Sequence, residues 1–445
     1  MAWEFVSLQQ GIDQAGSAIQ LLWKPGADPW KPPVVADEYV SWAAEQDAWR
    51  SGVALSDLSY HMSDTFIRGA DAARLLGDVS ANNISAFADG QAKQFVPVGA
   101  DGNIITDGIL LRERQDAYVL SGVPAAQNWV AYHAETGGYD VDIQTDPAMD
   151  YRPNEQPRLF RLQVQGPAAL EVVQRAFGGP LPEVKFFHSV PVELAGARFR
   201  ALRHGMAGQP GYEFIGQHAD HDAVKEALLV AGAASGIVHV GALAYATNGI
   251  ESGWISTPTP AIYTDPTLAD YRRKLGLFTY EGQNPLYGSF YSDDIADYYT
   301  SPWELGYGRS LSFAHDFIGR DALAAAKDTV RRVKVTLEFD EADALAAIGP
   351  ADLYVNDYGR QRLEVDGELV GTAFQSARIV PEGKVLALAL VDRSVAAPGS
   401  WVEVVWGDHP GHGAPADATD AFPRIRATVQ PVPYNAFART GYRAD

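Results

Sequence analysis

The 445-residue chain contains no cysteine. This absence excludes disulfides, thiolate nucleophiles and metal sites with cysteine ligands. No apolar run approaches the roughly 20 residues that a membrane-spanning helix needs. The first residues also lack the basic region and apolar core of a secretory signal. We therefore expect a cytoplasmic protein whose chemistry depends on oxygen and nitrogen groups.

Positive charge is scarce as well. The chain has 35 Lys and Arg residues against 56 Asp and Glu residues, a formal net charge of −21. Nucleic-acid binding needs clustered cations that neutralise phosphates, and the sequence has no such basic stripe. The charge therefore disfavours DNA, RNA and anionic lipid as partners, whereas 47% hydrophobic and 20% charged residues are typical of a globular protein.

The N-terminal residues 1–45 are expected to form an extension of the main body. A short helix-like piece comes first, and a proline-rich stretch follows at residues 24–33. Because proline fixes φ near −65°, such a stretch favours an extended arm. An arm of this kind could cover a pocket.

The rest of the chain divides into a body, residues 46–330, and a C-terminal domain, residues 331–445. In the body, helix-like stretches alternate irregularly with β-branched runs, as at 70–76, 221–232 and 102–111. The lack of a regular βαβ period favours an α+β fold. In the C-terminal domain, alternating apolar runs between Gly, Pro and Asp turns indicate an antiparallel barrel or sandwich. These runs are 333–339, 369–374, 385–391 and 401–406.

Residues 202–214, Leu-Arg-His-Gly-Met-Ala-Gly-Gln-Pro-Gly-Tyr-Glu-Phe, form the most informative stretch. Three glycines and a proline bend the loop so tightly that a ligand could approach its backbone. The loop then enters an apolar strand that carries Glu213, an acid able to hold a flat ligand. Taken alone, the stretch also fits a glycine-rich hairpin with a solvated glutamate. It lacks both phosphate-binding glycine patterns, so nucleotide phosphates are disfavoured as ligands.

This loop and three further blocks, in the same order, resemble the aminomethyltransferase family, that is, the glycine-cleavage T-protein and its relatives. The blocks are Gln-Val-Gln-Gly-Pro at 163–167, Pro-Trp-Glu-Leu-Gly at 302–306 with Asp-Phe-Ile-Gly-Arg-Asp-Ala-Leu at 316–323, and Asp-Gly-Glu-Leu-Val-Gly-Thr at 366–372. The resemblance implies a folate-binding body, a C-terminal β-barrel and tetrahydrofolate as cofactor.

Longer strings resemble one branch of that family, the tetrahydrofolate-dependent O-demethylases of methoxybenzoates such as vanillate and syringate. These strings lie at residues 49–50, 59–64, 132–139, 203–208 and 251–255. They imply transfer of a methyl group from a lignin-derived methoxylated aromatic, rather than a plain glycine-cleavage role.

The resemblance also assigns catalytic residues. An aryl methyl ether needs a proton at its oxygen because phenoxide leaves poorly, and a positioned acid contributes about 10² to 10⁴-fold in rate. Tyr245 takes the position of that acid, and His61 that of a substrate-side histidine, whose imidazole titrates near neutral pH. Asp107 falls where the family keeps an acid facing the folate nitrogens. Judged from residue type alone, the three also fit a core tyrosine, a structural histidine and a turn aspartate.

Four residues are expected to hold the cofactor. Glu213 matches the position that binds the pterin through charge-assisted hydrogen bonds, Gln165 that of an amide contact and Trp254 that of a stacking ring. Arg203 belongs to the same pattern, ahead of the glycine-rich turn.

The expected substrate residues include two departures from the demethylase pattern. Val123 replaces the arginine that clamps the substrate carboxylate, and Pro32 replaces a tyrosine of the arm. Loss of one partner from a buried ion pair costs roughly 3 to 5 kcal/mol, so a benzoate anchored at this position is disfavoured. The changes favour a neutral or larger aromatic in a more apolar pocket. Trp30 and Tyr60 complete the expected substrate set.

Two other functions remain open. A lyase could release formaldehyde from the hydroxymethyl group of an aromatic dimer of the phenylcoumaran type, with Tyr245, His61 or Asp107 as base. Tetrahydrofolate could then capture the formaldehyde, or the formaldehyde could leave freely and folate would be dispensable. The chain could also be a non-catalytic folate-binding relative. Two histidine pairs, His218 with His221 and His409 with His412, lack a full zinc ligand set, so no metal is expected. A homodimer is a possible assembly.

Overall fold

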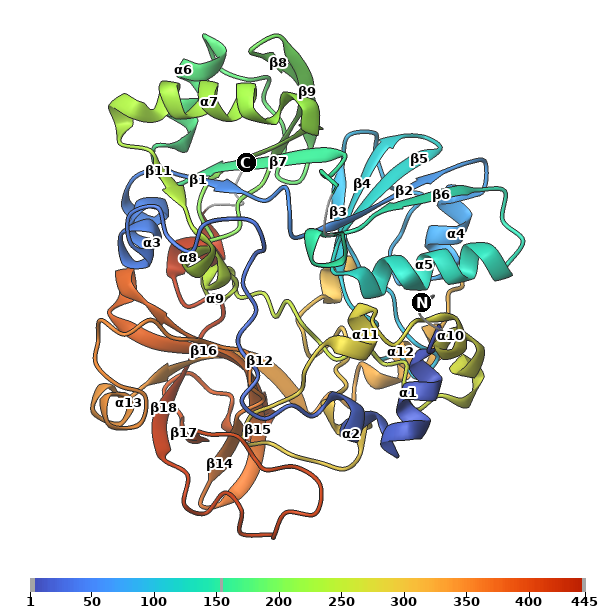
Figure 1. Ribbon diagram of the computed structural model, residues 1–445, viewed down its shortest axis with the longest axis vertical. Coiled ribbons are helices and arrows are strands. Elements are labelled where there is room, and N and C mark those ends of the chain that lie inside the picture. Colours follow the sequence, from blue (N-terminus) through green and yellow to red (C-terminus); the bar gives the residue numbers. More distant parts are fainter. Residues whose placement is uncertain (1–4, 153–154, 442–445) are drawn as a thin grey trace.

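The computed structural model describes residues 5–152 and 155–441, which form three β-sheets, each with its own hydrophobic core. The sheets lie around a common centre, with the N-terminal helices at one side (Figure 1). Residues 1–4, on which part of the signal-peptide expectation rested, lie outside the described residues.

The first sheet has five antiparallel strands in the order β3-β4-β5-β2-β6. Two helices pack against it, and their apolar residues join Ile67, Leu110 and Leu120 in one core. The elements are β2 Ser63–Arg68, β3 Ala92–Phe95, β4 Gly108–Arg114, β5 Ala117–Gly122, β6 Asp142–Asp146, α4 Ala72–Asp78 and α5 Pro124–Thr136.

The second sheet has six strands in the order β11-β1-β7-β10-β9-β8, of which only β1 and β11 are parallel. Two helices, α6 and α7, cover one of its faces, as Figure 1 shows. The elements are β1 Ala54–Asp57, β7 Leu159–Gln165, β8 Ser189–Leu194, β9 Ala197–Arg203, β10 Gly211–Gln217, β11 Val238–Val240, α6 Ala169–Phe177 and α7 His221–Gly232.

Strand β7 has apolar side chains on one face of the sheet and mostly polar side chains on the other. Side chains alternate across a strand, and Phe160, Leu162 and Val164 pack into the core under α6 and α7. Arg161 and Gln163 therefore project to the opposite face, toward the centre of the molecule, and both are buried there. The sequence of β7 thus places a cation inside the protein.

The third sheet is an antiparallel barrel. Six strands close in the order β15-β14-β17-β18-β12-β16 because the long strand β15 pairs with both β14 and β16, and the two-residue strand β13 pairs with β15. The strands are β12 Arg332–Phe339, β13 Asn356–Asp357, β14 Arg362–Val365, β15 Glu368–Ile379, β16 Lys384–Asp392, β17 Trp401–Val405 and β18 Arg424–Gln430. In β16, Ala387 and Ala389 fill the barrel, whereas Leu386 and Leu388 pack outward against Ile250 of the body.

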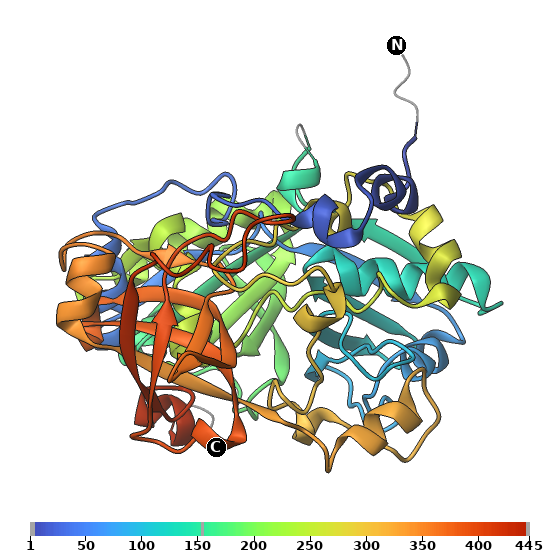
Figure 2. The same cartoon turned by 90° about the horizontal axis from the view of Figure 1, so that it is seen from below.

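The remaining helices connect and flank the sheets. Figure 2 shows the barrel, in orange and red, next to the five-stranded sheet, in blue and cyan. These helices are α1 Leu8–Ala15, α2 Ala18–Leu22, α3 Trp42–Ser51, α8 Ala242–Ala246, α9 Asn248–Ser252, α10 Ala269–Lys274, α11 Tyr280–Gln283, α12 Arg320–Ala326, α13 Glu341–Ala347 and α14 Ala436–Thr440.

The expected α+β fold with a C-terminal antiparallel barrel is confirmed. One strand expectation needs correction: residues 102–107 are irregular, and the strand begins only at Gly108. Ile104 and Ile105 are buried as parts of a loop, so apolar β-branched residues there do not signal a strand. The division into three units at residues 45 and 330 stays a prediction. Among the described residues, no helix is long and apolar enough to span a membrane.

Candidate active site

A cavity of about 1220 Å³ lies where the three sheets meet. Its walls include Ile109 of the first sheet, Glu213 of the second, Gln375 of the barrel and Trp30 of the N-terminal arm. Pockets for one small ligand are usually about 300 to 1,000 Å³. The cavity is therefore larger than the usual site for one small ligand.

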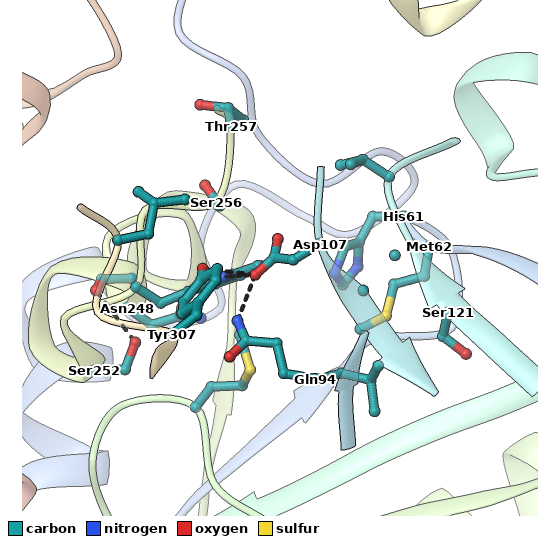
Figure 3. A pocket seen from close by; sticks show the side chains of 18 of the residues that line it. His61, Met62, Gln94, Asp107, Ser121, Asn248, Ser252, Ser256, Thr257 and Tyr307 are labelled. Atoms are coloured by element: carbon teal, nitrogen blue, oxygen red, sulfur yellow. Dashed lines mark hydrogen bonds between the residues drawn. The ribbon is translucent and has the colours of Figure 1, made fainter. Parts of the chain in front are cut away.

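Asp107 occupies one wall, directly before strand β4. Its Oδ2 accepts hydrogen bonds from Gln94 Nε2, from Trp254 Nε1 at 2.7 Å and from the Tyr307 hydroxyl at 2.8 Å. Figure 3 shows Gln94 and Tyr307 directed at the same carboxylate. The other oxygen, Oδ1, is buried without a hydrogen-bond partner among the described residues. Burial raises the pKa of Asp107, so a donor that reaches Oδ1 would relieve a real cost.

Glu213 lies on β10 and is 4% exposed. Its Oε1 accepts from Nη1 of Arg161 at 2.9 Å, and Nη2 of Arg161 contacts Asp64 Oδ1 at 2.6 Å and the Ser121 hydroxyl. Two carboxylates thus neutralise one buried guanidinium, which fixes Glu213 at the cavity wall. The preceding loop holds Gly205 and Met206 in the same wall.

Tyr245 and His61 meet on a further wall. The tyrosine hydroxyl lies 3.0 Å from His61 Nε2, and the Trp30 ring lies 5.7 Å from the imidazole, centroid to centroid. Burial, with the charge of Arg161 as the next cause, lowers the pKa of His61 to about 4. Burial and the charge of Glu213 raise the pKa of Tyr245. At neutral pH the pair is an uncharged imidazole and a protonated phenol.

The arm and helix α3 hold Tyr245 in place. The first amides of α8, Ala242 N and Leu243 N, donate to the arm carbonyls of Ala36 and Asp37 at 2.8 and 3.1 Å. Glu45 of α3 accepts from Gly241 N at 2.8 Å through one oxygen, and from two arm amides through the other. A short helix has few internal hydrogen bonds, so these contacts satisfy the amides at its start.

Seven of the eleven expected residues line this cavity: Tyr245, His61, Asp107, Glu213, Trp254, Val123 and Trp30. The indole N–H of Trp254 also donates to Asp107, a contact that was not expected from the sequence, and stacking of its ring on a ligand stays a prediction.

The other four do not line it. Gln165 instead accepts from Met206 N and Ala207 N, at 3.0 and 3.2 Å, and so shapes the loop from behind. Arg203 donates to the Val184 carbonyl. Tyr60 packs edge-on against His218 and His221. These contacts replace the direct ligand contacts that we expected.

Pro32 is the fourth. It is buried and does not line the cavity, whereas Asp28 and Trp30 of the same arm do.

Several polar residues of the cavity wall were not predicted from the sequence. Arg161 carried no local signal, because polar residues that alternate with apolar ones along a strand usually face solvent. Asn248, one turn after Tyr245, also lines the cavity, and its buried Nδ2 has no partner among the described residues. Tyr280 and Arg360 line the cavity too but carried no local signal.

These features fit a reduced pterin. A pterin ring is flat and carries several N–H donors, which suit the open Asp107 oxygen and the buried Glu213 carboxylate. The wall also offers the aromatic face of Trp254. The donor set lacks a metal character: no group of three or more His, Asp or Glu residues that could hold an ion occurs within residues 5–152 and 155–441.

Residues 28–264 match the GCVT N-terminal domain family. A syringate O-demethylase from a Sphingobium species is 37% identical over 98% of this chain and 97% of its own length. A sesamin methylene transferase from a Sinomonas species is 30% identical over 83% of this chain and 82% of its own length. An aminomethyltransferase from Streptomyces avermitilis is 27% identical over 83% of this chain and 86% of its own length.

The fold has a solved counterpart. The glycine cleavage system aminomethyltransferase T from Bartonella henselae covers 94% of this chain, and the chain covers 95% of that structure, with a TM-score of 0.61 at 18% identity. The family match spans more than half of the sequence, and the identity to the demethylase extends over nearly all of it. The chain therefore belongs to the aminomethyltransferase family, close to the syringate O-demethylases.

Proposed function

We propose that the protein is a tetrahydrofolate-dependent one-carbon transferase that removes a methyl group from a methoxylated aromatic compound. The observation that carries this proposal is that two sets of functional residues line the same cavity. The Tyr245–His61 pair supplies an acid, and the Asp107–Glu213 wall supplies acceptors for a pterin. The names of the demethylase and methylene transferase relatives support the same class of reaction.

The imidazole can prepare Tyr245 for proton transfer. Nδ1 of His61 is buried without a partner among the described residues, and a bare acceptor there costs less than an unpaired N–H. The proton of the neutral ring therefore belongs on Nε2, from which it donates to the Tyr245 oxygen. This leaves the tyrosine proton free for the ether oxygen of the substrate and stabilises the tyrosinate that results.

The opposite wall holds the acceptor. When bound, tetrahydrofolate supplies the nitrogen nucleophile that takes the methyl group. Asp107 and Glu213 would accept hydrogen bonds from it, and Trp254 would present its ring. The three contacts that Asp107 Oδ2 accepts keep this carboxylate rigid, so the pterin meets a site that needs little reorganisation.

The aromatic substrate would lie between His61, Trp30, Met62 and Val123, all of which line the cavity. These contacts are largely apolar, and Val123 offers no clamp for a benzoate. We infer a lignin-derived methoxylated aromatic that is held by other means than an arginine at position 123.

Turnover of vanillate, syringate, guaiacol and a hydroxymethyl phenylcoumaran dimer, with and without tetrahydrofolate, tests the proposal. Methyl-tetrahydrofolate and free formaldehyde are measured separately. Folate-dependent loss of a methoxy group, with methyl-tetrahydrofolate formed, is the expected result. Formaldehyde released from the dimer alone, without folate, would replace the transferase by a lyase. Tight folate binding without turnover of any compound would instead point to a non-catalytic relative.

A further inference from the structure

Arg360 is a buried cation in the cavity wall that no carboxylate neutralises. It lies between β13 and β14 and is 4% exposed. Its guanidinium donates to three backbone carbonyls, those of Thr257 at 2.7 Å, Tyr358 at 3.2 Å and Phe374 at 3.4 Å. Its Nε has no partner, and no ion pair forms with any carboxylate in the described part of the chain. The charge of Asp357 raises the pKa of Arg360, but it is the smallest of the named causes.

Arg161, in the same cavity, shows how a buried guanidinium is usually neutralised. There two carboxylates, Asp64 and Glu213, neutralise the guanidinium within hydrogen-bond distance. Carbonyls satisfy N–H groups but leave the net charge uncompensated, and an uncompensated buried charge is costly. Burial accordingly lowers the pKa of Arg360 to about 10. The wall at Arg360 is therefore suited to an anion that enters the cavity.

The position of this cation is rigid. Arg360 N donates to the Tyr287 carbonyl at 2.7 Å, and Phe290 N donates to the Arg360 carbonyl at 2.8 Å. A Cβ at Gly288 would lie 2.5 Å from Arg360 N, so only glycine fits this close backbone approach. The guanidinium also lies over the Phe374 ring, 4.3 Å from its centroid. A group held this firmly loses little freedom when it binds a ligand.

Tyr280 adds a second donor to the same wall. Its hydroxyl is buried without a hydrogen-bond partner among the described residues, although the residue lines the cavity. Tyr280 and Arg360 line the same cavity. A cation and an unpaired hydroxyl are a donor pair for one anionic oxygen.

Hydrogen bonds connect residues near Arg360 to the helix that carries Tyr245. Tyr358, two residues before Arg360, donates its hydroxyl to the Ala246 carbonyl at 3.0 Å, directly after Tyr245 in the chain. Gln375 of β15 donates to the same carbonyl at 2.8 Å. The barrel therefore sets the place of Arg360 relative to Tyr245 through two hydrogen bonds.

We propose that Arg360 and Tyr280 form an anion-binding subsite that anchors an acidic oxygen, carboxylate or phenolate, of the aromatic substrate. The inference rests on the proposed function and names what replaces the missing clamp at Val123. The anchored oxygen belongs to a part of the substrate that faces the barrel, while the methoxy oxygen faces Tyr245. Arg360 is already buried before the anion binds, so binding requires no further loss of water from the guanidinium.

Matched substrates test the subsite. Syringate and its primary amide differ in charge at one group, and kcat/KM is compared for both with the wild-type protein, Arg360→Gln and Tyr280→Phe. We expect the wild type to prefer the acid by about 10- to 100-fold, the range for a charge-assisted hydrogen bond. Arg360→Gln should lose this preference while it still converts the amide. Tyr280→Phe should reduce the preference about 3- to 10-fold. An unchanged preference in both variants would overturn the proposal.

The control variant is Arg378→Gln. Arg378 is a buried arginine of the same barrel that also donates to backbone carbonyls, Leu353 and Gly349, but it lies outside the cavity wall. It should keep the wild-type preference. If Arg360→Gln fails to fold, Tyr280→Phe decides the question, because the Tyr280 hydroxyl has no hydrogen-bond partner among the described residues and its removal breaks no such bond.

Calorimetry separates this inference from the proposed function. Benzoate and benzamide bind without reaction, so the acid preference of the subsite is measured even if no substrate is demethylated. Absence of methyl-tetrahydrofolate from every compound, with benzoate still preferred through Arg360, would remove the proposed function alone. If Arg360→Gln bound tetrahydrofolate more weakly than the wild type but bound benzoate equally well, Arg360 would contact the folate and not the substrate. This result would overturn the proposed subsite.

Discussion

At the scale of single residues, the hydroxyl of Tyr245 is the group on which the chemistry depends. Its raised pKa keeps it protonated at neutral pH. Tyr245→Phe should therefore lower kcat by about 10² to 10⁴-fold, the usual contribution of a positioned acid. The fold should be unaffected, since the hydroxyl faces the cavity. Tyr118→Phe, which removes a buried hydroxyl far from the cavity wall, is the control. Equal turnover in both variants would exclude Tyr245 from the mechanism.

His61 gives a pH-dependent prediction. Its pKa is about 4 in the folded state against about 6.5 in the unfolded chain. Between these values the unfolded state binds more protons, so His61 makes stability rise with pH from 4 to 6.5. The full effect of this difference in pKa on the free energy of unfolding is up to about 3 kcal/mol. His61→Gln should remove this part of the slope in urea unfolding. A slope identical to that of the wild type would show that His61 is not buried as a neutral ring.

Most residues of this site could be predicted from strings that resemble a family. The direction in which each side chain points could not. Tyr60 is adjacent to His61 in the chain but packs against histidines outside the cavity. Gln165 lies on the strand expected for it, yet its amide supports the loop from behind. Arg360 reaches the cavity only because the barrel folds against the body, and no local pattern carries that information.

At the scale of elements, the arm and helix α8 are joined through one buried carboxylate. Glu45 accepts from Tyr39 N and Val40 N of the arm and from Gly241 N before α8. Glu45→Ala would leave the buried amide of Gly241 unpaired, at about 1 to 3 kcal/mol, and would release the two arm amides from their shared acceptor. We expect faster amide exchange at residues 36–46 and 241–246 and a lower kcat, because Tyr245 lies on α8. Asp47→Ala changes an exposed acid of the same helix and should have neither effect.

If Glu45→Ala kept the wild-type exchange rates in both segments, the coupling between arm and helix would be refuted. A variant with faster exchange in the arm alone would mean that α8 is held by the body without the arm. Only the joint change supports a role for the arm in placing the acid.

Helices α3 and α9 meet at a buried acid with the opposite pH behaviour. Trp49 Nε1 donates to Glu251, and burial raises the pKa of Glu251 to about 7 from 4.5. The folded state then binds more protons between pH 4.5 and 7, so stability falls over this range as pH rises. Glu251→Gln keeps an acceptor for Trp49 and should flatten the fall by up to about 3 kcal/mol. Unfolding curves from pH 4 to 8 measure it, with exposed Glu226→Gln as the control. An unaltered fall in Glu251→Gln would place the titration elsewhere.

Elements with a clear period were predictable, whereas loops with apolar residues were not. The barrel strands follow from alternation, because Leu386, Ala387 and Leu388 fill two different cores on the two faces of β16. The run at residues 102–107 has similar residue types, but Ile104 only forms an isolated bridge with Val98. Burial in a loop and burial in a strand select the same side chains, so composition does not separate them.

At the scale of the whole molecule, the cavity is lined by residues of all three sheets, so a ligand bound there contacts several parts of the fold at once. Asp107 adjoins the first sheet and Glu213 lies on the second. A pterin held by both would join the two sheets in one binding event. At 100 times its dissociation constant, tetrahydrofolate should stabilise the protein by about 2.7 kcal/mol, provided that it binds only the folded state.

The same linkage predicts where the stabilisation is felt. Amide exchange should slow at residues 105–110 and 211–215 together, because one ligand contacts both walls. Glu213→Gln should weaken protection in both segments, not only in its own strand, since affinity is a property of the whole site. Glu193→Gln, at an exposed acid of β8 in the second sheet, should keep full protection. Protection confined to the second sheet in the wild type would mean that Asp107 does not contact the ligand, and the two-walled cavity would then lose its role as a single folate site.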